Sequence, residues 1–163
     1  MDVWEYESPL GRIFLAGEGD FLTGLWFDGQ KYFPHLPPER TGTPILRQTE
    51  SWLQRYFSGE QPEIDELPLA PKGSEFQQQV WALMRQIPYG ETLSYAELSR
   101  RIARLRGLEH MSAQAVGGAV GHNPISIIQP CHRVLGSDGS LTGYAGGLKR
   151  KVWLLELEQK RRL

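Results

Sequence analysis

The sequence predicts an α+β protein in which a small sheet-plus-helix domain precedes a helical domain. Short aromatic and β-branched runs separated by turn residues fill the first 33 of the 163 residues. Apolar residues recur at helical spacing through most of residues 74–160. A connector with three prolines and no periodicity, residues 60–74, lies between the two patterns. We therefore predict one domain at residues 1–71 and another at residues 72–163.

Three short strands and one helix make up the first predicted domain. The strands are expected at residues 3–6, 11–16 and 21–27. Glycines and prolines separate them at intervals typical of a small antiparallel meander. A helix is expected over Pro44–Phe57, because Ile45, Thr49 and Trp52 recur at helical spacing and Gly59 follows its end.

The second predicted domain holds three helices, each preceded by a serine that can cap it. These serines are Ser74, Ser94 and Ser112. Glu97 should add a capping box to the second helix, whose apolar stripe runs to Leu105. The third helix, residues 113–120, is built almost entirely of small residues and follows a break at Gly107, which gives a helix-turn-helix pattern. A further helix is expected from Leu148 to the C-terminal region.

The composition argues against several classes of protein. No stretch approaches the roughly 18 consecutive apolar residues of a membrane span. The acidic N-terminus lacks the basic and apolar regions of a secretory signal. The single cysteine allows neither an intramolecular disulfide nor a cysteine-rich zinc site, and residues 1–71 contain no cysteine and only His35. We therefore expect a cytoplasmic protein without a bound metal, because a free thiol survives best in a reducing compartment.

Charge is divided unevenly between the two predicted domains. Residues 1–71 carry 5 Lys and Arg against 12 Asp and Glu, a net charge of −7, whereas residues 72–163 carry 13 against 7, a net charge of +6. One interpretation is a basic functional half beside an acidic one. The other is chance segregation of solvated surface charge.

The only cysteine, Cys131, lies between Pro130 and His132 after a short apolar run. Thiols react as thiolates, and a neighbouring imidazole lowers the thiol pKa, so a Cys-His pair is a chemically sensible nucleophile. A lone cysteine is more often a small buried hydrophobe. Neighbours in sequence need not face each other in space, so the local chemistry leaves both interpretations open.

Several ordered sequence blocks surround Cys131. Residues 130–134 read PCHRV, and around them stand IPYGETLSY at 87–95, AVGGA at 115–119, Asn123-Pro124, GYAGG at 143–147, Lys151, Leu154-Leu155 and Glu158. Across residues 73–158 these blocks resemble the O6-alkylguanine-DNA alkyltransferases, the methylated-DNA–protein-cysteine methyltransferases. The resemblance implies a C-terminal winged helix-turn-helix-like domain. The N-terminal half matches more loosely, as the ribonuclease-H-like domain that does no chemistry in that family.

The resemblance implies direct repair of alkylated DNA. Cys131 would take the alkyl group from O6-alkylguanine in double-stranded DNA, irreversibly and once per protein molecule, with O4-alkylthymine open as a second substrate. His132 would act as base through a water, and Glu158 would orient His132, so that the pair lowers the pKa of Cys131. Tyr144 would supply a proton to the leaving guanine, and Asn123 would hold the turn before the nucleophile. No cofactor and no obligate protein partner are implied.

The same resemblance implies how DNA is bound. The damaged base must be flipped out of the duplex, and Tyr95 would press on the phosphate 3′ to it. The helix of small residues would enter the minor groove, unlike the major-groove use of most helix-turn-helix proteins. The DNA-binding residues expected on this basis are Tyr95, Gln114, Ala115, Gly117, Gly118 and Arg133.

Two positions depart from the family pattern. Gln114 stands where the family usually has an arginine that fills the space left by the flipped base. Gln129 stands where the family usually has a β-branched apolar residue, just before Pro130. The first departure bears on base flipping, and the second on the packing behind the nucleophile. The loop around Arg104–Met111 is also longer than in compact members.

Two other functions compete with alkyl transfer. A DNA-binding sensor similar to the alkyltransferase-like proteins would bind damage without transfer, but such proteins replace the nucleophile, usually by tryptophan, and Cys131 argues against this. A cysteine hydrolase would need an oxyanion hole and a distant histidine, and such enzymes seldom place the two partners side by side as Cys131 and His132.

Overall fold

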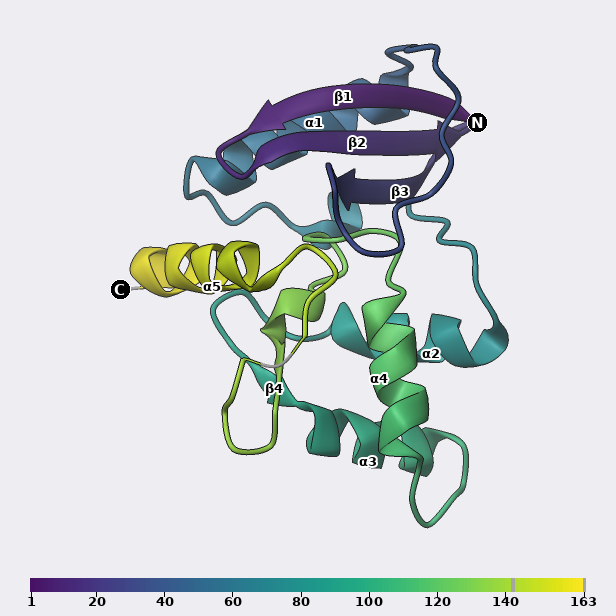
Figure 1. The fold of residues 1–163 in the computed structure, drawn as a ribbon, viewed down its shortest axis with the longest axis vertical. Helices are drawn as coiled ribbons and strands as arrows, with labels where there is room; N and C mark the ends of the chain where they lie inside the picture. The colour runs from purple at the N-terminus through teal and green to yellow at the C-terminus, as the bar shows by residue number, and fades with distance from the viewer. Residues whose placement is uncertain (142, 163) are drawn as a thin grey trace.

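A computed structural model describes residues 1–141 and 143–162, apart from the side chains of residues 161 and 162. It has the mixed α+β architecture that the sequence predicts, with a sheet and one helix in the N-terminal part and helices in the C-terminal part (Figure 1). Within these residues, none of the helices combines the length and the apolar character needed to cross a bilayer.

The N-terminal strands form an antiparallel sheet in the order β1-β2-β3. The strands are β1 (Asp2–Ser8), β2 (Gly11–Glu18) and β3 (Phe21–Phe27). Helix α1 (Pro44–Phe57) lies across one face of this sheet (Figure 1). Its buried face, which includes Ile45 and Trp52, packs with Leu15 of the central strand. The predicted meander and its covering helix are therefore confirmed.

The connector between the two predicted domains is more ordered than its sequence indicates. A short 3-10 helix, Ile64–Glu66, follows α1. Beyond it, the Leu22 N–H donates to the Pro68 carbonyl at 2.9 Å, and the Ala70 N–H donates to the Leu22 carbonyl at 2.8 Å. These bonds attach the connector to the outer edge of β3, where main-chain groups need partners.

The C-terminal part contains α2 (Glu75–Met84), α3 (Tyr95–Leu105), α4 (Ala113–Gly121) and α5 (Leu148–Arg162). Ser74, Ser94 and Ser112 accept hydrogen bonds from main-chain N–H groups of the first turns, so all the predicted caps are confirmed.

Two details of α3 differ from the prediction. The capping box does not form, because the Glu97 carboxylate binds Arg100 and Arg101 on its own helix and an ion pair is a stronger partner than a main-chain N–H. Leu105 is exposed at the last residue of the helix and leaves the apolar stripe.

A short parallel pairing that the sequence does not predict joins β4 (Leu93–Ser94) to β5 (Val134–Leu135). Each strand has two residues, too few to show an alternating apolar pattern. β5 directly follows a 3-10 helix, Cys131–Arg133. The pairing therefore attaches the segment around Cys131 to the start of α3.

Two hydrophobic clusters form the interior. The second joins α2, α3 and α4 and includes Cys131. The first contains the sheet and α1, together with Ile125, Ile128 and Leu154 from the C-terminal part. Because this core takes residues from both sides of residue 71, the two parts pack as one body, and the domain boundary stays a prediction.

The contact of Trp81 with Ala119 should matter for stability, because it joins α2 to α4. Trp81 is fully buried, and its Nε1 donates to the Ala119 carbonyl at 2.8 Å. Trp81→Phe keeps an aromatic ring but leaves this carbonyl unsatisfied beside a small void. We expect the free energy of unfolding to fall by roughly 1–3 kcal/mol in urea denaturation. Trp153→Phe, at a partly buried ring, should lose less, and an equal loss would contradict the assigned role of Trp81.

Candidate active site

The chain before Cys131 is folded around the side chain of Asn123. The Asn123 Oδ1 accepts from the Ile125 N–H at 3.0 Å, and its Nδ2 donates to the Gln129 carbonyl at 2.8 Å. The same Nδ2 donates to the Sγ of Cys131 at 3.2 Å. Within this loop Ile127 has a φ of 69°, which a β-branched residue rarely adopts. The bonds of Asn123 hold the loop in this conformation and reach the sulfur directly.

Cys131 lies at the wall of a cavity of about 310 Å³. The wall also includes Lys31, Tyr32, Tyr95, Gly117, Gly118 and Tyr144. The sequence blocks that carry Tyr95, the glycines of α4 and Tyr144 therefore converge on the sulfur, although they lie far apart in the chain. Lys31 and Tyr32 belong to the N-terminal part and were not predicted at the site.

The N-terminal part closes one side of this cavity through Tyr32. Its ring stacks on the ring of His122 with 3.9 Å between centroids and 24° between planes. Tyr32 has a φ of 60°, and the Lys31 N–H donates to the Ala145 carbonyl at 2.9 Å, so the segment is held next to the contact. Loop residues of this kind have no periodic pattern, so no sequence signal could have found them.

Two of the tyrosines that line the cavity, Tyr95 and Tyr144, keep their protons at neutral pH. Burial, and then the nearby Cys131, raises the pKa of Tyr95 to about 12. The same two causes raise the pKa of Tyr144 well above its ordinary value, and the Ser126 side chain acts in the opposite direction without offsetting them. Among the residues that the structure describes, the Tyr144 hydroxyl has no partner at hydrogen-bonding distance and angle. It is therefore a buried donor available to a ligand in the cavity.

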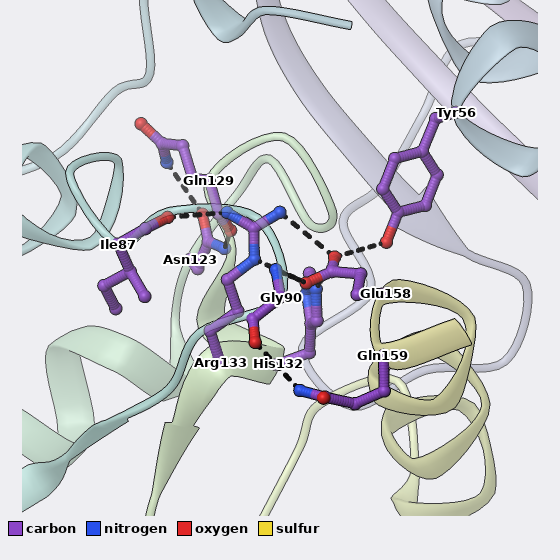
Figure 2. Close-up of polar contacts among 9 residues, drawn as sticks. All are labelled: Tyr56, Ile87, Gly90, Asn123, Gln129, His132, Arg133, Glu158 and Gln159. Carbon is purple, nitrogen blue, oxygen red and sulfur yellow. Dashed lines mark hydrogen bonds and ion pairs between the residues drawn. The ribbon is translucent and has the colours of Figure 1, made fainter. Parts of the chain in front are cut away.

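The buried carboxylate of Glu158 accepts hydrogen bonds from four residues in three parts of the chain (Figure 2). Its Oε2 accepts from His132 Nε2 at 2.7 Å and from the Tyr56 hydroxyl at 2.6 Å. Its Oε1 accepts from Arg133 Nε at 2.8 Å and from the Gly90 N–H at 3.3 Å. Tyr56 lies on α1, so the N-terminal part also reaches this carboxylate.

These contacts decide the charges of Glu158 and His132. Burial alone would raise the pKa of Glu158, but His132 and Arg133 outweigh burial and hold the pKa well below its usual range. Burial lowers the pKa of His132 more than Glu158 raises it, so the imidazole is neutral near pH 7. A carboxylate only accepts hydrogen bonds, so Nε2 carries the imidazole proton. Nδ1 then has a free lone pair, and among the described residues it has no partner.

Burial raises the pKa of Cys131 above its ordinary value. The hydrogen bond from Asn123 and the charge of Lys151 act in the opposite direction but only partly offset burial. This corrects the expectation that His132 and Glu158 lower the pKa. The physical reason is that the imidazole is neutral and its Nε2 faces Glu158, so it presents no cation to the sulfur. The resting Cys131 is therefore a thiol.

Lys151 is fully buried on α5. Its Nζ donates to the Val134 carbonyl at 2.8 Å and to the Gly143 carbonyl at 3.2 Å. These bonds hold the loop that carries Tyr144 against β5, next to the Cys131 segment. The sequence identified Lys151 as a motif residue without assigning it a role.

The position of Arg133 corrects the expectation that it contacts DNA. Its guanidinium is buried and donates to Glu158 and, at 2.7 Å, to the Ile87 carbonyl. A buried carboxylate beside a neutral imidazole needs a cation to compensate its charge, and Arg133 is that cation.

Tyr95, expected at DNA, begins α3 and lines the cavity, and the remaining residues expected at DNA lie along α4. Gln114 and Ala115 are exposed in the first turn of α4. A Cβ added at Gly117 or Gly118 would meet no atom within 4 Å. Internal packing does not require glycine at these two positions, and the part of α4 that they form presents bare backbone.

The described residues show no group of three or more His, Cys, Asp or Glu side chains that could hold a metal ion.

Comparison with known proteins gives concordant matches over nearly the whole chain. Two family models match: the ribonuclease-like domain of 6-O-methylguanine DNA methyltransferase at residues 5–71, and the DNA binding domain of the same family at residues 75–160. A methylated-DNA–protein-cysteine methyltransferase of Haemophilus influenzae is 42% identical over 94% of this chain and 84% of its own length. One of Methanosarcina acetivorans is also 42% identical, over 94% of this chain and 95% of its own. A crystal structure of Mycobacterium tuberculosis OGT in complex with DNA is 44% identical, with a TM-score of 0.86 over 99% of this chain and 94% of that chain.

The substitution Glu158→Gln should destabilise the fold, because it leaves the Arg133 guanidinium buried without its counter-charge. We expect a loss of about 3–5 kcal/mol at pH 7, measured by urea denaturation. Glu156→Gln, at an exposed position on the same helix, is the matched control and should change stability by less than about 0.5 kcal/mol.

The effect of Glu158→Gln should also depend on pH. The pKa of Glu158 is lowered in the folded protein, so its stabilising contribution is present above the unfolded pKa and is lost as pH falls toward the folded one. The difference in stability between the wild type and Glu158→Gln should therefore shrink below about pH 4. A difference that stays constant down to pH 3 would show that the carboxylate charge is not the cause.

Proposed function

The chain belongs to the 6-O-methylguanine DNA methyltransferase family, and we propose that Cys131 is the residue that accepts the alkyl group. Its activity is repair of DNA by transfer of an alkyl group to a cysteine of the protein itself. One observation carries the assignment of the acceptor. Cys131 is the only cysteine in the sequence, and it lines the cavity in which Tyr95 and Tyr144 meet the bare face of α4.

The transfer is a single displacement at the alkyl carbon. A bond forms from Sγ of Cys131 to this carbon as its bond to O6 breaks, and the electron pair passes to guanine. Nδ1 of His132 takes the thiol proton through a water, and Glu158 stabilises the imidazolium that results. The Tyr144 hydroxyl donates a hydrogen bond to the leaving base as negative charge develops on it. By way of His132 and water, the thiol proton ends on the released guanine.

The resting thiol has two consequences. Burial keeps Cys131 protonated until a substrate enters, so the sulfur is protected from oxidants that attack thiolates. Deprotonation then occurs as part of the attack, with His132 as the base.

The product thioether does not hydrolyse, so each protein molecule reacts once. The cytoplasm, where thiols stay reduced, is the compartment we propose.

Double-stranded DNA that contains O6-alkylguanine is the substrate we propose. The bare backbone face of α4 allows close approach to the minor groove, with Gln114 and Ala115 in its first turn. The cavity lies beside Gly117 and Gly118, so a base flipped out of the duplex would enter next to α4. Tyr95 forms part of the wall that this base would meet.

Incubation with alkylated duplex should change the mass of the protein once. We expect one protein molecule to remove one methyl group, with a single methyl on Cys131 by intact mass and peptide mapping. Cys131→Ser should abolish the gain and keep duplex binding within about threefold, since binding rests on α4 and phosphate contacts. Turnover beyond one equivalent would contradict the proposal. Binding without any mass gain would indicate a damage sensor instead.

The substitution Gln114→Arg should strengthen repair of duplex DNA. An arginine can stack in the space of the flipped base and donate to the orphaned cytosine, and it adds a charge near phosphates. Arg100, Arg101 and Arg104 of α3 all pair with Glu97, which holds them on their own helix although it neutralises only one of their three charges. We expect single-turnover repair of duplex to speed up by roughly threefold to tenfold, with little change on single strands.

Gln61→Arg is the matched control for the added charge, because Gln61 is exposed in the connector. It should leave the rates on both substrates unchanged. Equal duplex rates for the wild type and Gln114→Arg would show that Gln114 already fills the gap, or that α4 does not face the flipped base.

A further inference from the structure

An unbroken row of hydrogen bonds leads from Arg85 to the sulfur of Cys131. The Arg85 guanidinium donates to Oε1 of Gln129. The Gln129 Nε2 donates to Oδ1 of Asn123 at 2.7 Å, and the Asn123 Nδ2 donates to the Cys131 Sγ at 3.2 Å. Figure 2 shows the middle of this row, with the Gln129 amide directed at Asn123.

Main-chain groups fix the direction of every bond in the row. The Ile125 N–H can only donate, so the Asn123 atom that it faces must be the oxygen. The Gln129 carbonyl can only accept, so the other Asn123 atom must be the nitrogen. Gln129 must then present its NH₂ group to Asn123 and its oxygen to Arg85. All the donors therefore point from the cation toward the sulfur.

Gln129 is an unexpected residue at this position. Its side chain is fully buried, and burial of an amide is unfavourable unless both of its polar ends are bonded. The sequence pattern of the family has a β-branched apolar residue here, which fills the space without that requirement. An amide at this position therefore has a polar role in addition to filling the space.

Arg85 carries a charge that forms no ion pair with a carboxylate in the part of the chain that the structure describes. Among the described residues its only side-chain hydrogen bond is to Gln129, and it forms no ion pair. It is half-buried at the end of α2, where burial lowers its pKa without removing its charge near pH 7. Its field therefore acts on the buried amide more strongly than that of a solvated cation would.

We infer that Gln129 and Arg85 are positioning residues that polarise Asn123 and so stabilise the thiolate of Cys131 during alkyl transfer. Each bond in a hydrogen-bonded chain strengthens the next, so a cation at the far end makes the Asn123 N–H a better donor. A thiolate accepts this bond more strongly than a thiol does, so the row favours the reactive form. The inference deepens the proposed function and rests on Cys131 being the acceptor.

Other groups also act on the sulfur and stay constant in the test. Tyr95, Tyr144 and Lys151 interact electrostatically with Cys131 in the native protein. The His132–Glu158 pair lies in the adjoining part of the site. None of these residues contacts Gln129 or Arg85 through a described hydrogen bond, so a change in the row can be separated from them.

Iodoacetamide gives a direct measure of the thiolate, because Cys131 is the only cysteine and lines a cavity open to small reagents. The rate of modification is measured from pH 6 to pH 10 in the full-length protein without DNA. The rate should rise with pH as the thiolate forms, and we call this rise the ascending limb. For Gln129→Val we expect the ascending limb to move to higher pH, with a modification rate at pH 7 roughly threefold to tenfold lower than that of the wild type. Arg85→Met should move the limb in the same direction. Arg47→Met, which removes an exposed arginine of α1, should leave it in place.

The double variant separates a relay from a simple charge effect. If the row transmits the charge, Arg85→Met should have little further effect once Gln129→Val is present, so the two effects are not additive. If Gln129→Val leaves the ascending limb of the iodoacetamide rate at the same pH, the inference is overturned. Additive effects would overturn the link between Arg85 and Asn123. If Gln129→Val does not fold, as judged by thermal melting, Arg85→Met at its half-buried site still tests the row.

Transfer from O6-methylguanine duplex is measured on the same variants. The wild type must first gain one methyl group, and failure here would refute the proposed function while leaving the iodoacetamide result intact. Given transfer by the wild type, Gln129→Val should slow the single-turnover rate at pH 7 by roughly the same threefold to tenfold and move its pH profile in parallel. A shift in iodoacetamide reactivity with an unchanged transfer profile would overturn the role of the row in catalysis.

Discussion

The structure depends on one buried carboxylate whose charge must be compensated. Glu158 on α5 binds Tyr56 of α1, the main chain at Gly90 before β4, and His132 and Arg133 after Cys131 (Figure 2). Loss of any partner of a buried charge is strongly destabilising. The elements that carry these partners are therefore fixed relative to one another, and the segment of the nucleophile is fixed with them.

This arrangement sets the chemistry of the sulfur. Because Arg133 compensates Glu158, His132 can remain neutral at the centre of the cluster, with its proton on Nε2 and its lone pair on Nδ1. A neutral imidazole is a base, whereas an imidazolium would be only an electrostatic partner. The site therefore combines a resting thiol with a base ready to accept its proton. A protein that reacts once and cannot be regenerated benefits from a thiol that stays unreactive until its substrate arrives.

Local patterns in the sequence predicted the sheet, α1 and all the serine caps, because each depends on residues a few positions apart. The partners of Glu158 could not be predicted in this way: Tyr56 lies 102 positions and Gly90 68 positions before it. Sequence proximity was also misleading at the nucleophile. His132 follows Cys131 directly, yet its Nε2 faces Glu158, and the atom that contacts the sulfur belongs to Asn123.

The N-terminal part forms no bond in the proposed reaction, yet the site is incomplete without it. Its α1 supplies the Tyr56 hydroxyl to the carboxylate that orients the base. Its loop supplies Tyr32, which stacks on His122 and closes the cavity around the sulfur. The first hydrophobic core also joins the sheet to Ile125 and Ile128 in the loop before Cys131. A structural domain that lacks reactive groups can therefore still decide where the base points, how far the cavity extends and how firmly the loop before the nucleophile is held.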